Sequence, residues 1–424
     1  MLSSFLGRGP SARAVPVYLL LSGLGSLFFS MIVTVNLIYH VETVGLSPLQ
    51  LVLVGTTLEA VVVLFEIPTG VVADLVSRRR SILIGYGLIG VGFIIEGSIP
   101  AFAAILAAQV LWGIGYTFTS GATEAWITDE VGEAEVGPVL LRGNQAGMVG
   151  AIVGILLGTG LGLVAIQMPI ILGGIGYLLL TTALLRSMPE TNFQPTPRED
   201  RSTWQHMVVI ARDGLAIART RPVVRVMMVT SFLIGLSSEA FDRLWTKHLI
   251  DSFDFPELPW SNDIVLWFGM IELGGMLLSL LGAEALKRFH PGSLRPGTPT
   301  RLLATLATGR VVATGLFAFA GSLWLAIGAF WLRGLVMTAF YPTSEAWLNR
   351  NLESRTRATV LSFTEQVASV GEIGGGPPLG WVGSRFGVAR AIIASALIFT
   401  PAVGVLARAS HLQDHVAEPE TVPV

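Results

Sequence analysis

Long apolar stretches dominate the hydrophobic pattern of this chain. Runs of about 18 or more apolar residues recur from one end to the other, and each is long enough to cross the hydrocarbon core of a membrane as a helix. The pattern predicts twelve spanning helices, at about residues 16–41, 47–73, 80–98, 101–129, 138–165, 167–187, 222–250, 262–286, 302–322, 324–349, 357–383 and 388–408. Ser47, Pro48 and Gln50 form a capping box that marks the start of the second helix. The first stretch is too long for a signal-peptide core, so we expect it to be a retained span.

The chain repeats itself at an offset of 221 residues. The segment Ala122–Trp126 returns as Thr343–Trp347, and both copies place a glutamate in a long apolar stretch. The same offset aligns Gly113 with Gly334, Gln145 with Gln366, Gly150 with Gly371, and Gly154 with Gly375. We therefore expect an all-α membrane protein with two pseudo-symmetric six-helix bundles, at residues 1–187 and 222–408. A duplicated apolar chain with internal acids is typical of transporters, in which two rigid halves flank a polar site.

Two polar segments complete this organisation. Residues 188–221 begin with a proline-rich piece, Pro189 to Pro197, and continue as a predicted amphipathic linker helix on the membrane face. Its apolar side carries Trp204, Met207, Val208, Ile210 and Leu215, and its basic side carries Arg201, Arg212 and Arg219. Residues 409–424 form a short polar tail.

The positions of the basic residues predict the orientation. Most of the 27 lysine and arginine residues fall at the termini and in loops after even-numbered spans, as in Arg78–Arg80 and Lys287–Arg288. Asp251, Asp254, Glu257 and Asp263, by contrast, share a loop that carries no base. Because basic loops stay in the cytoplasm, we expect both termini to be cytoplasmic in a multi-pass plasma-membrane protein.

Composition excludes several classes of function. Hydrophobic residues make up 52% of the chain and charged residues 13%, which is too apolar for a soluble fold. The net charge of −2 suggests no nucleic-acid partner, and the absence of cysteine excludes disulfides and thiolate metal sites. Of the six histidines only His411 and His415 have metal-ligand spacing, which we interpret as a chance pair. With no phosphate-binding loop and no nucleophile–base set, we expect no cofactor, no metal, no enzymatic activity and no ATP-driven pumping.

The sharpest local motif follows the second predicted span. Gly70, Asp74, Arg78 and Arg79 match the loop signature Gly-x-x-x-Asp-(Arg/Lys)-x-Gly-(Arg/Lys)-(Arg/Lys), from which Leu75 and Ser77 depart. In this motif and in the duplication the chain resembles the major facilitator superfamily. The resemblance implies a secondary transporter in which these four residues latch the halves during gating. From the residues alone, Gly70 permits close helix contact, and Asp74 can pair with arginines or with a helix N-terminus.

A second motif points weakly to one branch of that family. Gly150, Gly154 and Gly158 resemble the glycines of the drug:proton antiporter motif, but Ile155 and Thr159 replace its proline and last glycine. The spacing by itself predicts one smooth helix face for close packing. The counterpart in the second half ends in Gly374–Pro378, a run expected to break or bend its helix.

Acidic residues inside the predicted spans are the main candidates for function. Because nine charges facing lipid would be very costly, most of these acids should face a central cavity or the cytoplasmic rim. We assign Glu59, Glu66, Glu239, Asp242 and Glu272 to a proton-coupling and substrate cavity together with the intramembrane bases Arg310 and Arg333. Glu124, Glu345, Glu365 and Glu372 are assigned structural roles, and Phe28, Trp245, Trp267, Phe340 and Tyr341 are candidates for stacking on substrate.

These observations lead to one functional hypothesis with open alternatives. Surplus carboxyl groups in a low-dielectric site take up protons or attract a cation. We therefore expect proton-coupled efflux of small amphipathic or cationic compounds by alternating access, from a monomer whose partners are substrate, protons and lipid. Uptake of a nutrient together with protons is the alternative within transport, and a membrane enzyme, a channel or a receptor are alternatives from other classes. The substrate itself is not readable from the chain.

Overall fold

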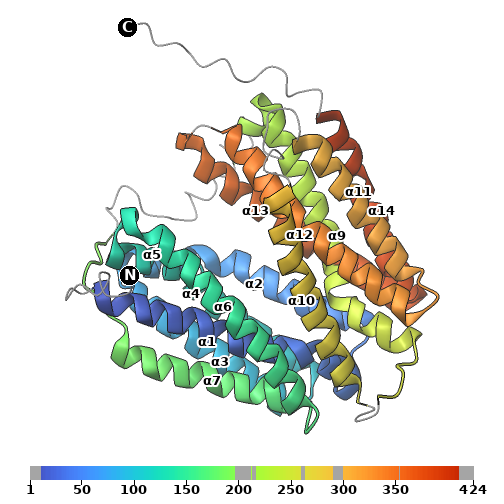
Figure 1. Ribbon diagram of the computed structural model, residues 1–424, viewed down its shortest axis with the longest axis horizontal. Helices are drawn as coiled ribbons and strands as arrows, with labels where there is room; N and C mark the ends of the chain where they lie inside the picture. The colour runs from blue at the N-terminus through green and yellow to red at the C-terminus, as the bar shows by residue number, and fades with distance from the viewer. Residues whose placement is uncertain are drawn as a thin grey trace, which may run out of the picture. The chain divides into compact units, whose positions relative to one another are not determined.

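The structure is a computed structural model that describes residues 11–195, 212, 216–258, 263–289, 299–352 and 354–409. Over these residues the chain is helical nearly throughout (Figure 1). The helices are α1 Ser11–Ile38, η1 Tyr39–Thr43, α2 Pro48–Leu75, α3 Arg78–Ser98, α4 Phe102–Thr119, α5 Ala122–Val131, α6 Glu133–Gly162, α7 Met168–Ser187, α9 Pro222–Ser252, α10 Ile264–Phe289, α11 Pro299–Ala318, α12 Leu323–Arg350, α13 Ser354–Phe386 and α14 Val388–Ala409. The predicted all-α class is confirmed.

Within the described ranges, eleven helical segments are long and apolar enough to cross a membrane. The one predicted span outside this set lies at 357–383 and corresponds to α13, which is helical over its whole length but carries Arg385, Glu365 and Glu372 as well as two prolines. The predicted capping box at the start of α2 is confirmed. Gln50 N donates to the Ser47 hydroxyl at 3.3 Å, and Ser47 N donates to the Gln50 side-chain oxygen at 3.0 Å.

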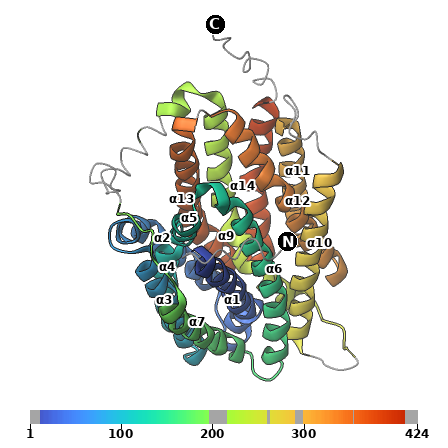
Figure 2. The ribbon, with the colours of Figure 1, turned by 60° about the vertical axis from the view of Figure 1, so that its left-hand side comes forward.

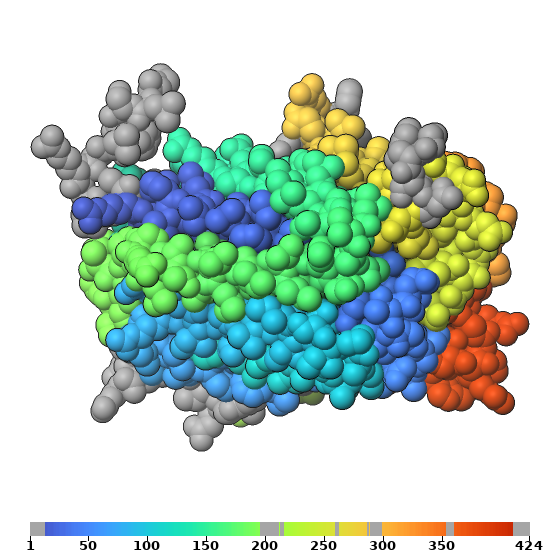
Figure 3. All heavy atoms as spheres, turned by 90° about the horizontal axis from the view of Figure 1, so that it is seen from below, coloured from blue at the N-terminus to red at the C-terminus, as the bar shows by residue number. Residues whose placement is uncertain are grey.

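The chain divides into two compact units. The first comprises Met1–Met207 with Asp254–Leu273, and the second comprises Val208–Phe253 with Gly274–Val424. In the first unit α1 packs along α6 and α7, α3 packs along α4 and α7, and α2 packs along α4 (Figure 2). The space-filling view shows α7, in green, lying along α3, in light blue (Figure 3).

The second unit repeats the pairings of α1 and α3. Its α9 packs along α13 and α14, and its α11 packs along α12 and α14, as α1 packs on α6 and α7 and α3 on α4 and α7. The repeat at an offset of 221 residues therefore corresponds to a repeated arrangement of helices. The two units therefore share one arrangement of helices.

Glycines bring the central helices of each bundle together. A Cβ on Gly150 would overlap the carbonyl oxygen of Gly23, and one on Gly154 would overlap that of Leu27. In the second unit a Cβ on Gly375 would overlap the carbonyl oxygen of Leu236, and one on Gly371 would lie 2.6 Å from that of Phe232. Such backbone contact is possible only without side chains, so the packing role expected from the glycine spacing is confirmed.

Two sequence expectations need correction. The span predicted at 101–129 corresponds to one apolar segment, Phe102–Val131, but it is two helices and not one, because the chain turns at Gly121, whose φ of +67° suits glycine, between α4 and α5. The run Gly374–Pro378 does not break its helix, since α13 continues through Pro377 and Pro378 to Phe386 while its glycines hold it against α9. Within the first unit, no described atom outside its own helix lies within 4 Å of a Cβ placed on Gly70, and its expected role in gating stays a prediction.

The predicted linker helix lies mostly outside the described residues. Arg212 and residues 216–220, including Arg219, are helical. Arg201, Trp204, Met207, Val208, Ile210 and Leu215 lie outside the described part of the chain, as do the tail and its histidines, His411 and His415.

Candidate functional site

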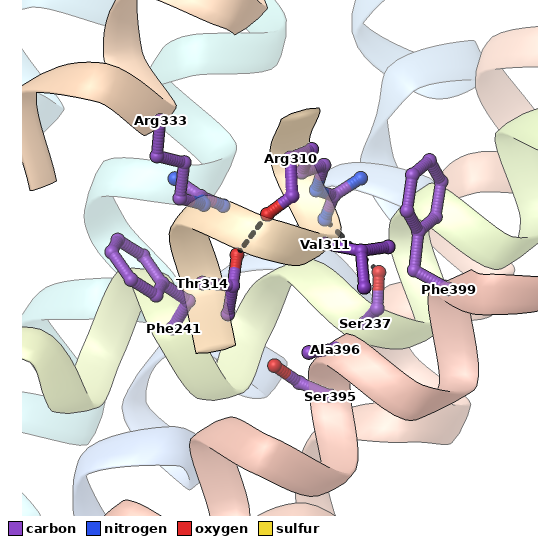
Figure 4. A pocket seen from close by; sticks show the side chains of 9 residues that line it. All are labelled: Ser237, Phe241, Arg310, Val311, Thr314, Arg333, Ser395, Ala396 and Phe399. Carbon is purple, nitrogen blue, oxygen red and sulfur yellow. Dashed lines mark hydrogen bonds between the residues drawn. The ribbon is translucent and has the colours of Figure 1, made fainter. Parts of the chain in front are cut away.

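The second unit holds a group of charged side chains within its helices. Arg310 on α11 and Arg333 on α12 line one pocket with residues of α9 and α14 (Figure 4). The full lining is Ser237, Phe241, Arg310, Val311, Thr314, Arg333, Ser395, Ala396 and Phe399. The pocket has about 190 Å³ of empty volume, but the gaps between its side chains are too narrow for a water molecule.

Arg310 is almost completely buried, at 4% exposure. Its Nη2 donates to the Ser237 hydroxyl at 3.0 Å, and its guanidinium carbon lies 4.2 Å from the centre of the Phe399 ring. Its Nη1 is buried and has no hydrogen-bond partner among the described residues. Within that part of the chain no carboxylate lies within 4.0 Å of this guanidinium, so its positive charge has no direct counter-ion.

Arg333 is the partly exposed neighbour of this buried charge. Its Nη2 lies 3.2 Å from Oδ1 of Asp242 on α9, a carboxylate that is 52% exposed. Its guanidinium carbon lies 3.8 Å from the centre of the Phe241 ring, and its Nε is buried with no partner in the described structure. Each arginine therefore rests one face on an aromatic ring and keeps in-plane N–H donors available.

Other acids of the second unit are also paired. Glu239 is 5% exposed and lies 3.4 Å from Nε of Arg243, one turn further along α9. The Ser238 hydroxyl donates to Glu372 at 3.4 Å. The acids nearest to the pocket thus have basic or hydroxyl partners and are not a cluster of surplus carboxylates.

The remaining sequence candidates differ in their exposure. Glu59 and Glu272 are half-buried, whereas Glu66, Glu124, Glu345 and Glu365 are exposed. Among the aromatic candidates, Trp245 packs on Phe330 at 4.5 Å between ring centres and Phe28 packs on Tyr177 at 5.7 Å. Trp267 donates to Pro256 O and Phe340 is buried, while Tyr341 is exposed. Most of these rings serve packing.

The first unit contains a buried polar cluster that the sequence reasoning missed. Glu96 near the end of α3 is fully buried and accepts a hydrogen bond from Asn36 Nδ2 at 2.5 Å and one from Gln109 Nε2 at 3.2 Å. Nε2 of His40 lies 2.7 Å from the same carboxylate, and the Tyr39 hydroxyl donates to the Glu96 carbonyl oxygen at 2.9 Å. Glu96 lies inside the span predicted at 80–98, so the rule that selected the other intramembrane acids applies equally to it.

The predicted gating motif makes its own set of contacts within the first unit. Arg78 pairs with Asp129 on α5 at 2.6 Å. Glu190 accepts hydrogen bonds from the Ser77 hydroxyl at 2.6 Å and from Arg79 N at 2.8 Å, and so caps the start of α3. Asp74 is half-buried one turn before Arg78. The motif therefore joins α3 to α5 and to the segment after α7.

Comparison with known proteins identifies the family. Residues 19–375 match the Major Facilitator Superfamily. The chain belongs to the Major Facilitator Superfamily. It is also 23% identical over 362 residues to the uncharacterized MFS-type transporter YxaM of Bacillus subtilis (strain 168), an alignment that covers 82% of this chain and 84% of that protein. This major facilitator protein is therefore a multi-pass membrane protein and a secondary transporter by type.

Solved structures share the major facilitator fold at low sequence identity. The nucleoside transporter NupG is 16% identical, with a TM-score of 0.74 over 95% of this chain and 99% of that one. A bacterial homolog of the human lysosomal transporter Spinster, inward-facing and unoccupied, is 14% identical with a TM-score of 0.73 over 97% and 100%. A POT family transporter in complex with 5-aminolevulinic acid is 13% identical with a TM-score of 0.72 over 94% and 96%. These likenesses define the fold and do not select the drug:proton antiporter-like branch.

Proposed function

We propose that this major facilitator protein is a proton-coupled secondary transporter that works by alternating access in the plasma membrane. The observation that carries the proposal is the Asp242–Arg333 pair beside the buried Arg310. A carboxylate that is half exposed and paired with one arginine can exchange that partner for a proton. Protonation of Asp242 removes its negative charge and releases Arg333 for another anion.

The neighbouring groups favour Asp242 as the exchanging acid. Glu239 is held against Arg243 in a buried position, and Glu372 accepts a hydrogen bond from Ser238. Tyr341, an exposed tyrosine on α12, follows Arg333 by about two turns. Glu59, Glu66 and Glu272 stay secondary candidates for proton coupling.

The direction of transport, efflux or uptake, depends on how proton binding is coupled to substrate binding. Efflux in exchange for protons requires substrate and proton to compete for one group, as the sequence hypothesis has it. Uptake together with protons requires the proton to strengthen substrate binding at Arg310, which is the behaviour expected when protonation of Asp242 frees Arg333 as a second donor to the anion. This second mode is favoured by the arginine content of the pocket.

The test is flux in reconstituted liposomes under an imposed pH gradient. Organic acids, sugars, nucleosides and lipophilic cations are offered in turn, and the initial rates are measured with the gradient in each direction and after its collapse by an ionophore. We expect at least one compound to move at a rate that depends on the gradient. Saturable movement of every active compound at a rate independent of the gradient would contradict proton coupling.

A further inference from the structure

We infer that the pocket between Arg310 and Arg333 binds a monoanionic group of the substrate, a carboxylate or a sulfonate. This inference rests on the proposed transport function and names the substrate class of the same site. It replaces the expectation of a cationic substrate, because the charged side chains that line the pocket are both arginines.

The first argument is the unbalanced charge of Arg310. A buried guanidinium without a carboxylate partner is costly unless something supplies the missing anion. Arg310 is 4% exposed, and its Nη1 is buried without a partner in the described structure. The side chain is nevertheless well held, since Ser237 accepts from its Nη2 and Phe399 supports its face (Figure 4).

The second argument is the matching arrangement of Arg333. This guanidinium also rests on an aromatic ring, that of Phe241, and also has a buried donor, Nε, without a partner in the part of the chain described. Two planar cations in one pocket, each with free in-plane donors, suit the fork geometry by which arginine binds carboxylates and related oxyanions. A cationic group would be repelled by the arginines, and a neutral acceptor would satisfy these donors without balancing their charge.

The third argument is the charge count. Arg310 and Arg333 contribute two positive charges, and Asp242 on Arg333 contributes one negative charge. One monoanion balances the remainder, whereas a dianion such as a phosphate monoester would leave an excess negative charge while Asp242 is ionised. Because the gaps are too narrow for water, the lining side chains must move apart when the anion enters.

The experiment compares ligands that share one benzyl scaffold. Phenylacetate, benzylsulfonate, benzylphosphonate, phenylacetamide and benzylamine are titrated against the purified full chain in mildly alkaline buffer, in which the phosphonate is a dianion and the amine is still a cation. Binding is measured by calorimetry and by the shift in melting temperature. We expect phenylacetate and benzylsulfonate to bind and the amide and the amine not to bind. Benzylphosphonate distinguishes a requirement for one charge from a general affinity for oxyanions.

Substitutions locate the binding. Arg310→Gln and Arg333→Gln should weaken monoanion binding about tenfold to a hundredfold, which is the usual worth of a charged hydrogen bond. Arg310→Lys, which keeps the charge and loses the fork, should weaken it less, and it also serves if Arg310→Gln does not fold. Arg301→Gln is the matched control, because Arg301 is an exposed arginine on the same helix and should bind as the wild type does.

Four results would overturn the inference. They are monoanion binding that is unchanged in both arginine variants, binding of the amine in preference to the acids, tighter binding of the phosphonate dianion than of either monoanion, and no binding by any anion of the series. None of these measurements uses a pH gradient. The inference about the substrate can therefore fail while proton coupling is confirmed, and proton coupling can fail while the inference about the substrate is confirmed.

Discussion

Glu96 is a fully buried carboxylate of the first unit with three side-chain partners, and its removal should strongly destabilise the protein. Glu96→Ala leaves Asn36, Gln109 and His40 without their buried acceptor, which costs about 3–5 kcal/mol for a buried charged group. Glu96→Gln keeps an acceptor oxygen and should cost less. The measurement is thermal unfolding of the purified protein, with Glu135→Ala, an exposed acid at the start of α6, as the control. Equal melting temperatures for Glu96→Ala and the control would show that the cluster contributes no stability.

Removing the charge of Arg310 should raise the stability of the protein, whereas removing that of Glu96 should lower it. If its buried charge serves ligand binding and not folding, Arg310→Met removes a desolvated cation while keeping most of the volume against Phe399. Ser237 stays satisfied because its hydroxyl also donates to the Ile234 carbonyl oxygen at 3.0 Å.

We therefore expect Arg310→Met to raise the free energy of unfolding by about 1–4 kcal/mol and to abolish anion binding. Denaturant titration of this variant beside Arg301→Met measures the first effect, and the calorimetric titration measures the second. A large loss of stability would instead make Arg310 a structural residue.

Sequence reasoning identified Arg310, Arg333, Asp242 and Glu239, because a charge inside an apolar span is visible without a structure. Counting charges led to the expectation of surplus acids and of an amphipathic or cationic substrate. In the structure Asp242 lies on Arg333, and Arg310 has no carboxylate beside it among the described residues. Which charge neutralises which depends on contacts between residues 91 positions apart, and spacing along one helix does not contain that information.

The helix pairs α1–α6 and α9–α13 depend on backbone contact, which glycine substitutions can test. Gly150→Ala and Gly371→Ala each force a methyl group against a carbonyl of the partner helix and should destabilise by about 1–3 kcal/mol. Gly160→Ala and Gly374→Ala, on the same two helices, meet no described atom within 4 Å and should be neutral or stabilise by up to about 1 kcal/mol.

Thermal unfolding of the four variants measures this contrast. If Gly150→Ala melts at the same temperature as Gly160→Ala, and Gly371→Ala at the same temperature as Gly374→Ala, then stability does not depend on glycines that allow close helix contact.

The loop between α2 and α3 is tied to α5 by the pair Arg78–Asp129. Both side chains are mostly shielded, with 16% and 25% exposure, so the pair should be worth more than a surface ion pair. A double-mutant cycle with Arg78→Ala and Asp129→Ala should give a coupling energy of about 0.5–3 kcal/mol. Additive losses would mean that the two residues act independently.

Helix positions were largely readable from hydropathy, and the exceptions have local causes. The turn at Gly121 depends on a single positive-φ residue within a continuous apolar stretch, so hydropathy averaged over the length of a span does not reveal it. The continuity of α13 through Pro377 and Pro378 was unexpected because proline normally ends helices. There the long contact with α9 outweighs the local preference.

The internal repeat gave the architecture of the whole molecule. An offset that aligns glycines and glutamates over two halves predicted two bundles, and the structure shows the same helix pairings in each unit. Membership of the Major Facilitator Superfamily then follows from the match over residues 19–375. Substrate class required the side-chain contacts of the second unit, since the fold is shared by transporters with different substrates.

The central claim is that proton and substrate meet at Asp242, Arg333 and Arg310. Its most direct test is the initial transport rate of an active compound in liposomes, with and without a pH gradient, for the wild type, Asp242→Asn and the control Glu135→Gln. We predict that the gradient accelerates transport by the wild type and by the control but not by Asp242→Asn, which still binds phenylacetate. A gradient response in Asp242→Asn equal to that of the wild type would contradict the account.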